Sequence, residues 1–372
     1  MKRRQQRQSM IRVFSSLMAM MLAALLPWMA GAAKAADSRS VIKPKVVTEK
    51  AKHDTDDPAI WIHPDDPAQS LIIGTDKNRD GALYVYNLDG KIIREVRDIR
   101  RPNNVDVEYG LMLNDKPVDI VVTTERYEDR LRIFSLPDFT PIDNGGIPVF
   151  EGEKDRDPMG ISLYRRPSDG TIFAIVGRKK GPKDGRYLWQ YRLEDDGTGH
   201  VAAVKVREFG IWSGRAEIEA IAVDDELGYV YYSDETKGVR KYHADPDQPG
   251  ADKELALFAT DHVKKDHEGL SIYRLNDGTG YILLSNQQAD EFNVYPREGT
   301  AGNPHNHPLL KAWKASTHES DGSEVTGVVL GDAFPNGLFV AMSDNVTFQL
   351  YDWADIAGDD LKVAPDMAVG RP

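Results

Sequence analysis

The sequence has no cysteine among its 372 residues and only nine histidines. The absence of thiols excludes disulfide bonds, a lipid-modified cysteine and a cysteine nucleophile. It also argues against a zinc site, because zinc prefers Cys and His ligands. A core large enough to hold the fold together must therefore come from apolar side chains alone.

Long hydrophobic runs are also lacking, except near the N-terminus. Residues 1–12 hold five basic residues and no acid, residues 17–26 are apolar, and small residues surround Lys34. This order predicts a signal peptide, residues 1–35, cleaved after Ala35 or Ala36, and an exported protein that is periplasmic or secreted. The alternative is an N-terminal membrane anchor, but the apolar run is shorter than the ~20 residues of a spanning helix.

Positive charge is scarce as well, with 47 Lys and Arg against 59 Asp and Glu and a net charge of −12. Six of the basic residues fall within residues 1–35, so 41 remain and the net charge of the mature chain is −18. Such a surface argues against nucleic acid and anionic lipid as partners. It is more typical of a cation-binding protein or a well-solvated enzyme, free of the membrane once the signal is removed.

The mature chain, residues 37–372, shows little helical periodicity, and short runs rich in Val, Ile, Tyr and Phe indicate an all-β fold. One short strand recurs six times, with its last aromatic residue 48 to 57 residues after the previous one. These aromatic residues are Tyr86, Phe134, Tyr191, Tyr242, Tyr295 and Tyr351. A second strand precedes each of them, at 71–75, 120–124, 173–177, 229–233, 281–285 and 338–342. A third strand opens each unit, at 59–62, 104–107, 160–163, 220–223, 269–272 and 327–330.

Six repeats of about four strands each predict a single-domain, six-bladed β-propeller of antiparallel blades. The sixth repeat leaves no room for a good outer strand after Trp353, so residues 41–48 are expected to supply it and close the ring. A β-sandwich or a β-helix with chance periodicity is the alternative. Chance would not place three kinds of strand in register six times.

Carboxylates gather before or within the inner strands and in adjoining loops, which converge on the channel mouth of a propeller. They are Asp54, Asp56, Asp57, Asp106, Glu217, Glu219, Asp234, Glu235, Asp266, Glu268, Glu319, Asp321 and Glu324. Crowded carboxylates raise one another's pKa values, and a hard cation resolves that conflict. Calcium, which takes about six to eight oxygen ligands, fits this set. For any single acid, the alternative is that it caps a turn or faces water.

Basic residues follow the second strand of the first three repeats. They are Lys77, Arg126, and the run Arg178, Lys179 and Lys180. Equivalent positions in neighbouring blades face one arc of the mouth, so cations beside a metal-binding arc suggest an anionic substrate held by both. Arg suits bidentate contacts with phosphate oxygens, whereas Lys acts as a point charge.

Two motifs resemble the signatures of the β-propeller (alkaline) phytases. Residues 53–61, H-D-T-D-D-P-A-I-W, are similar to D-x-x-D-D-P-A-[hydrophobic]-W, and residues 103–106, N-N-V-D, are similar to N-N-[hydrophobic]-D. Further likenesses run through Lys77, Arg126, Lys179, Glu219, Asp234, Glu235, Gln287 and residues 266–270. Together they extend from about Asp54 to Trp353.

The resemblance implies a calcium-dependent phosphatase of the 3-phytase type that acts on phytate, myo-inositol hexakisphosphate. It implies several calcium ions, with cleavage-site ligands Asp56, Glu219, Asp266, Glu268 and Gln287. Asp57 and the backbone of Val105 would hold a neighbouring ion, and Glu324 is a looser match to a metal ligand. Phosphate would contact Lys77, Arg126 and Lys179, and Glu235 would position the water or a metal. Catalysis would thus depend on Asp56, Glu219, Glu235 and Glu268.

Two positions depart from the family pattern. Met159 stands where some members carry a phosphate-binding Tyr, and Lys180 stands where some carry an acid. Both affect a second, non-cleaving phosphate site more than the chemistry.

The absent nucleophiles agree with this resemblance. The chain has no cysteine and no His after an Arg, so the R-H-G-x-R-x-P motif of histidine acid phosphatases is missing. Direct attack by a metal-activated water remains. A calcium-dependent propeller lactonase and a non-catalytic binding propeller are the alternatives, and a monomer is expected.

Overall fold

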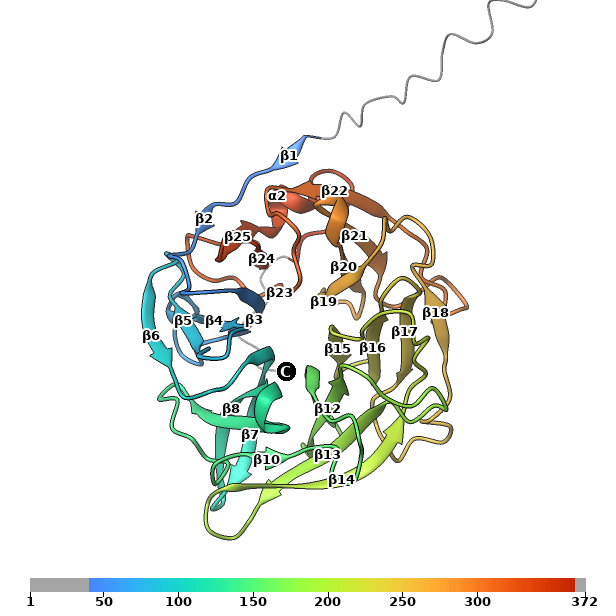
Figure 1. Cartoon of the computed structure of the whole chain (residues 1–372). Helices are drawn as coiled ribbons and strands as arrows, with labels where there is room; N and C mark the ends of the chain where they lie inside the picture. The colour runs from blue at the N-terminus through green and yellow to red at the C-terminus, as the bar shows by residue number, and fades with distance from the viewer. Residues whose placement is uncertain (1–39, 365–372) are drawn as a thin grey trace, which may run out of the picture. The chain divides into compact units, whose positions relative to one another are not determined.

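Strands rich in Val, Ile and Tyr make up nearly all the regular structure of residues 40–364, the part of the chain that this computed structural model describes. They form six sheets arranged as blades around a central axis (Figure 1). The predicted all-β, six-bladed propeller is therefore confirmed. The predicted signal peptide lies outside the described residues. No helix among the described residues is long and apolar enough to cross a membrane.

The first three blades run in chain order through four antiparallel strands. Blade one is β3 (Thr55–Trp61), β4 (Leu71–Asp76), β5 (Leu83–Tyr86) and β6 (Ile92–Val96). Blade two is β7 (Pro102–Leu113), β8 (Lys116–Glu125), β9 (Arg130–Leu136) and β10 (Ile147–Pro148). Blade three is β11 (Pro158–Arg165), β12 (Ile172–Arg178), β13 (Leu188–Asp195) and β14 (Val201–Phe209).

The last three blades repeat this order. Blade four is β15 (Ile221–Asp224), β16 (Tyr229–Asp234), β17 (Gly238–His243) and β18 (Ala256–Phe258). Blade five is β19 (His267–Arg274), β20 (Gly280–Asn286), β21 (Glu291–Pro296) and β22 (Lys311–Ala315). Blade six has β23 (Ser323–Thr326), β24 (Leu338–Ser343) and β25 (Thr347–Asp352), followed by the short helix α2 (Trp353–Ala357).

The N-terminal segment closes the ring, as predicted for residues 41–48. Strand β2 (Val46–Val47) pairs antiparallel with β25 and becomes the outer strand of blade six. Just before it, β1 (Val41–Ile42) pairs in parallel with β22 and adds a fifth strand to blade five. One short segment therefore joins two neighbouring blades.

The prediction that residues 327–330 form the inner strand of blade six is wrong. The strand is β23, which precedes these residues and pairs Ser323 with Ala341 and Thr326 with Leu338. In β23 the alternate residues Ser323 and Val325 are buried. Because one of these two is polar, the hydrophobic pattern of the sequence favours the more apolar segment that follows. That segment instead leads into a turn at residues 331–333, which a bridge between Leu330 and Phe334 closes.

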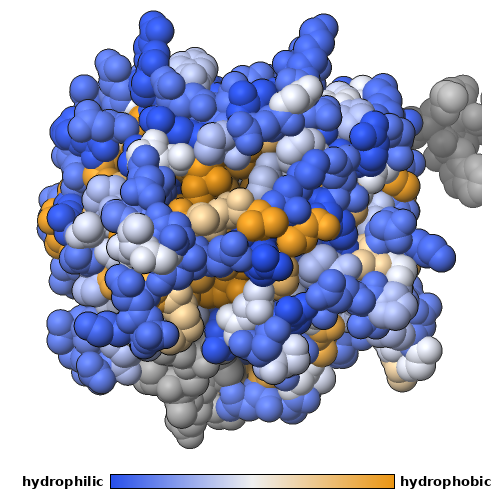
Figure 2. All heavy atoms as spheres, turned by 90° about the horizontal axis from the view of Figure 1, so that it is seen from below, coloured by the Kyte–Doolittle hydropathy of each residue, from blue (hydrophilic) through white to orange (hydrophobic). Residues whose placement is uncertain are grey.

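The core consists of apolar layers between adjacent blades. For example, Ile120 and Val122 of β8 lie in one buried cluster with Ile161 and Leu163 of β11. Seen from below the orientation of Figure 1, the surface is mostly hydrophilic, with hydrophobic side chains gathered in a small group near its middle (Figure 2). Burial between blades fixes the inner strands, and these carry the site described next.

Candidate active site

One backbone position recurs at the same end of every blade, directly after the second strand. It is occupied by Lys77, Arg126, Lys179, Glu235, Gln287 and Asp344. In five blades its N–H donates to a carbonyl oxygen of the segment that leads into the inner strand. The bonds are Lys77 to Asp54 (2.6 Å), Arg126 to Arg101 (3.1 Å), Lys179 to Asp157 (2.9 Å), Glu235 to Glu217 (3.1 Å) and Asp344 to His318 (3.1 Å). The repeat therefore brings these side chains to one mouth.

Lys77 lies between two carboxylates from the opposite ends of the chain. Its Nζ is 2.5 Å from Oδ1 of Asp56, on β3, and 3.1 Å from Oδ2 of Asp321, just before β23. Asp56 is buried, and burial raises its pKa well above the usual value, although the Lys77 ammonium opposes this. Burial lowers the pKa of Lys77, but the surrounding carboxylates outweigh it and keep this side chain charged.

Asn103, at the start of β7, connects this pair to the next blades. Its Nδ2 donates to Oδ2 of Asp56 (3.0 Å) and lies against Oε1 of Glu219. Its Oδ1 accepts from Nη1 of Arg126 at 2.9 Å. One buried amide thus holds two carboxylates and a guanidinium, which fixes the spacing between negative and positive groups at the mouth.

Carboxylates of blades four and five form two overlapping groups around Glu235. One contains Glu217 and Glu219, the other Asp266 and Glu268, and within each group the ligand oxygens lie within 4.8 Å of one another. Burial, and then the nearby charge of Glu219, raises the pKa of Glu235 to about 8. Burial likewise raises the pKa of Glu268 well above the usual value. We call Glu219, Glu235, Asp266 and Glu268 the acidic arc.

Glutamine side chains extend this arc toward blade six. Nε2 of Gln287 donates to Oδ1 of Asp321, and Nε2 of Gln288 donates to Oδ2 of Asp266 at 2.8 Å. Asp321 thereby contacts both Lys77 and Gln287. The sequence placed Asp321 among the mouth acids but not among the metal ligands. Its position just ahead of an inner strand was the available signal.

A second acidic group lines a channel cavity of about 190 Å³, which is bordered by all six inner strands. The backbone N–H of Val105 donates to Oδ2 of Asp57 at 3.0 Å. Burial, reinforced by the charges of Asp106 and Asp57, raises the pKa of Glu324 well above its usual value. The predicted pair Asp57 and Val105 is therefore in contact, and Glu324, the looser match to a metal ligand, lies near enough to feel the charge of Asp57.

A family model described as phytase matches residues 9–367 of the chain. The chain belongs to the phytase family. The 3-phytase of Bacillus subtilis (strain 168) is 30% identical over 328 residues, which cover 84% of this chain and 82% of that protein.

Two solved propellers give only weak likenesses. The Dos1 propeller has 13% identity and a TM-score of 0.42 over 80% of this chain and 67% of that one. The β-propeller domain of Cps50 (Swd1) from Myceliophteria thermophila has 13% identity and a TM-score of 0.44, with 82% and 85% covered. Neither bears on the function.

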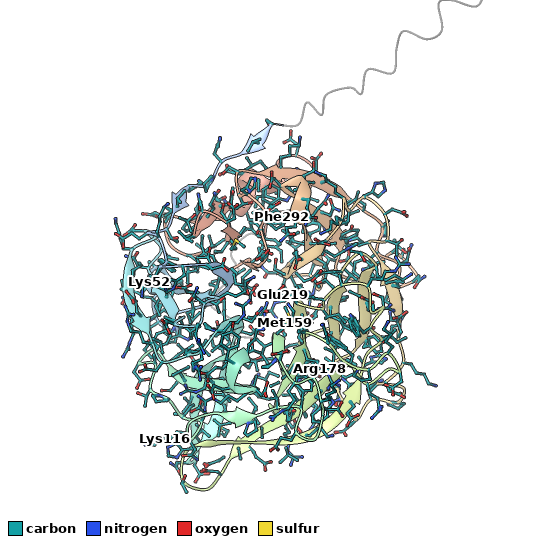
Figure 3. The ribbon with its side chains drawn as sticks, in the orientation of Figure 1. Lys52, Lys116, Met159, Arg178, Glu219 and Phe292 are labelled. Carbon is teal, nitrogen blue, oxygen red and sulfur yellow. The ribbon has the colours of Figure 1, made fainter. Side chains whose placement is uncertain are left out.

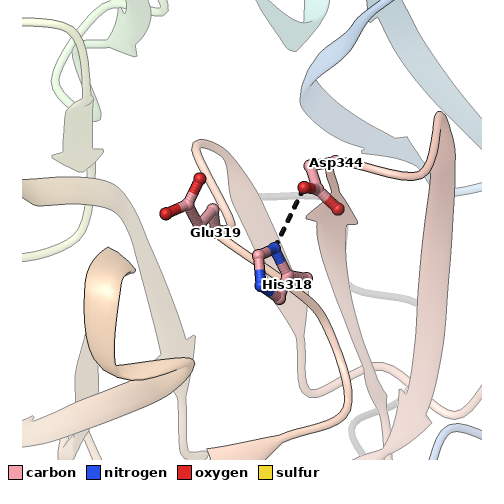
Figure 4. Close-up of side chains that lie close together, drawn as sticks. All are labelled: His318, Glu319 and Asp344. Carbon is pink, nitrogen blue, oxygen red and sulfur yellow. Dashed lines mark hydrogen bonds and ion pairs between the residues drawn. The ribbon is translucent and has the colours of Figure 1, made fainter.

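Several acids that the sequence grouped at the mouth of this phytase have other contacts. Oδ2 of Asp106 accepts from Ser162 Oγ (3.0 Å) and Leu163 N (2.7 Å), so it joins blades two and three. Asp234 is ion-paired with Arg240 at 2.9 Å. Glu319 groups with His318 and Asp344 in an exposed cluster, where His318 is bonded to Asp344 at 3.0 Å (Figure 4).

The run 178–180 also separates. Arg178 is buried over the ring of Phe150, 4.5 Å from its centroid, and pairs with Glu153, while Lys180 is exposed. Only Lys179 turns to the mouth, with Nζ 2.5 Å from Glu217. Figure 3 shows Glu219 near the centre of the ring and Arg178 farther out. Lys77, Arg126 and Lys179, which we call the basic arc, thus come to equivalent positions.

The acidic arc and its neighbours fit a hard cation. Oε2 of Glu268 is buried without a hydrogen-bond partner among the described residues, an arrangement that costs free energy unless a cation satisfies it. The donors of the arc are carboxylate oxygens, and the nearby amide of Gln287 adds another possible oxygen, the donor type calcium prefers. Met159 is buried, and its side chain has no hydroxyl with which to contact a phosphate, unlike the Tyr found at this position in some family members.

Proposed function

We propose that this member of the phytase family hydrolyses phytate to lower inositol phosphates and inorganic phosphate, as a calcium-dependent 3-phytase-type enzyme. The observation that carries the proposal is the two-sided mouth, in which the basic arc and Glu235 of the acidic arc occupy equivalent backbone positions and the other acids of that arc lie beside Glu235. Such a site can hold divalent cations and a polyanion next to each other. The family match and the curated 3-phytase relative support the substrate class.

Calcium would be held by Asp56, Glu219, Asp266, Glu268 and Gln287 at the cleavage site. Asp57, the backbone of Val105 and Glu324 would hold a further ion in the channel. When bound, calcium supplies positive charge that neutralises phosphoryl oxygens and lowers the pKa of a water.

The chain's own groups bind and orient the substrate. Lys77, Arg126 and Lys179 would contact phosphate, with Arg126 already aimed by its bond to Asn103. Glu235 lies in both groups of the acidic arc and, with a pKa of about 8, can hold or release a proton near neutral pH. We propose that Glu235 orients the attacking water.

The basic arc favours this function over a propeller lactonase, whose neutral substrate needs no three equivalent cations. A non-catalytic binding propeller would be expected to carry a continuous apolar patch. The large exposed hydrophobic residues among residues 40–364 are instead spread over several blades, as in Ile93, Met112, Val204 and Leu310. We further propose that residues 1–35 direct export and that residues 37–372 act as a monomeric domain.

Phosphate release from phytate, measured with calcium, after exhaustive EDTA treatment and after calcium is restored, tests the function. We expect activity with calcium, its loss in EDTA and its recovery. A lactone panel run in parallel separates the lactonase. Full phosphate release after chelation would contradict the calcium requirement, and no release with calcium would contradict the function.

A further inference from the structure

Asn103 is a buried amide whose hydrogen-bond donors are outnumbered by the acceptors around them. Its Nδ2 carries two hydrogens. Three oxygens lie within hydrogen-bond distance of this nitrogen, and they belong to Asp56 (Oδ2, 3.0 Å), Asn104 (Oδ1, 2.9 Å) and Glu219 (Oε1). One of the three acceptors therefore always lacks a hydrogen, which costs free energy at a buried position.

Exchanging the nitrogen and the oxygen of either amide does not relieve this shortage. Oδ1 of Asn103 accepts from Nη1 of Arg126 at 2.9 Å, so a nitrogen in its place would face another donor. Asn104 donates to Asp57 with its own nitrogen, so its Oδ1 must face Asn103. The excess of acceptors is therefore built into the arrangement of these side chains.

Arg126 depends on this amide for its direction. The residue is buried, its Nε has no hydrogen-bond partner among the described residues, and its Nη1 donates to Asn103. A rotation of the amide therefore moves the acceptor that aims the guanidinium. By contrast, Lys77 and Lys179 contact carboxylates directly.

A cation on the carboxylates resolves the shortage of hydrogens. When Asp56 or Glu219 gives its oxygen to a cation, the two hydrogens of Nδ2 suffice for the two acceptors that remain. The amide then keeps one orientation, with Oδ1 toward Arg126. We propose that Asn103 is a positioning residue that couples cation binding by Asp56 and Glu219 to anion binding by Arg126. The inference rests on the proposed function and adds a link between its two ligands.

The coupling is measured as the ratio of two calcium dissociation constants, obtained by calorimetry without and with an excess of myo-inositol hexasulfate, which is not hydrolysed. Calcium titrated into hexasulfate alone supplies the blank. Because coupling between two ligands is reciprocal, the bound polyanion should tighten calcium binding. We expect Asn103→Ala to reduce this ratio about fivefold. Arg126→Ala should reduce it at least as much, and Asn103→Ala should have no further effect in that variant.

Gln190→Ala is the matched control, because Gln190 is also a buried amide that holds a guanidinium. Its Oε1 accepts from Nε of Arg207 at 2.9 Å, and its Nε2 donates to the carbonyl oxygen of Ala244 at 2.9 Å. Neither of these bonds involves a carboxylate. The ratio for Gln190→Ala should stay within about twofold of the wild type.

Circular dichroism and melting temperatures identify a variant that fails to fold. Asn103→Ser then replaces Asn103→Ala, since its shorter side chain cannot reach Arg126 and both carboxylates at once. An unchanged ratio in a folded Asn103 variant overturns the inference, and so does an equal loss in Gln190→Ala. A further loss on adding Asn103→Ala to Arg126→Ala also overturns it, because Asn103 would then act through another group. A wild type that binds no calcium, or whose calcium affinity hexasulfate leaves unchanged, counts against the proposed function itself.

Discussion

The basic arc and Glu235 of the acidic arc are built on the same backbone position but carry opposite charge. In blades one to three the residue after the second strand is Lys77, Arg126 or Lys179, and in blade four it is Glu235. The N–H of each makes the same bond to the segment before the inner strand. The propeller repeat therefore fixes where a side chain points, while the residue type decides whether it holds a cation or an anion.

The largest effect should come from removing a carboxylate of the acidic arc. We expect Glu219→Gln to lower phosphate release by about a thousandfold, because the variant loses a charged oxygen at the metal site. Circular dichroism should show an unchanged fold. Glu319→Gln, an exposed acid of the same mouth, is the control and should retain activity. Comparable rates for Glu219→Gln and Glu319→Gln would refute the acidic arc.

In the basic arc, Arg126→Ala should lower kcat/KM for phytate by about a hundredfold. The variant loses a buried guanidinium that can donate two parallel hydrogen bonds to phosphate. Arg126→Lys should recover only part of this, since an ammonium cannot make two parallel bonds. Steady-state kinetics measures both. Full recovery by Lys would mean that charge alone matters at this position.

Lys77 connects the basic arc to two further carboxylates of the mouth, because it contacts Asp56 and Asp321. We expect Lys77→Ala to bind calcium severalfold more tightly, since the two carboxylates lose a competing cation, and to cleave phytate more slowly. Calcium titration by calorimetry gives the affinity. A weaker calcium affinity than that of the wild type would show that Lys77 supports the metal site instead of competing with it.

A smaller effect concerns pH and stability in the calcium-free protein. Burial raises the pKa of Asp106 to about 6 and that of Asp225 to about 7, and Glu235 titrates near 8. The folded protein therefore binds more protons than the unfolded chain between about pH 4 and 8, and its stability falls as pH rises through that window. In EDTA, we expect the melting temperature to be a few degrees lower at pH 8 than at pH 5. Calcium should remove this trend, and a rise with pH in EDTA would contradict it.

The propeller fold could be predicted from the sequence because each repeat carries an aromatic residue at the same place, and each blade must bury it. The closing strand at 41–48 followed from the missing strand of blade six. The inner strand of that blade was missed because β23 has polar Ser323 and Glu324 where a channel wall tolerates them, whereas the next residues are more apolar. Periodicity finds strands that pack on two neighbours more readily than strands that line a cavity.

The site was only partly readable. Equivalent positions after the second strands placed Lys77, Arg126, Lys179 and Glu235 together. Pairing partners were not visible, so Asp234 was grouped with the mouth although Arg240 neutralises it. The bridging role of Asn103 depends on side-chain directions across three blades, and nothing in its local sequence reports them. Ligand roles for individual carboxylates remain predictions.

The N-terminal segment that holds β1 and β2 affects the order in which the ring can fold during synthesis. The strand that completes blade six comes from the beginning of the chain, and the two partners are about 300 residues apart. Loop closure over that separation must come late, after five blades already exist. Until residue 352 has been synthesised, the ring has a free edge, and a nascent chain in that condition stays easier to unfold than the finished one.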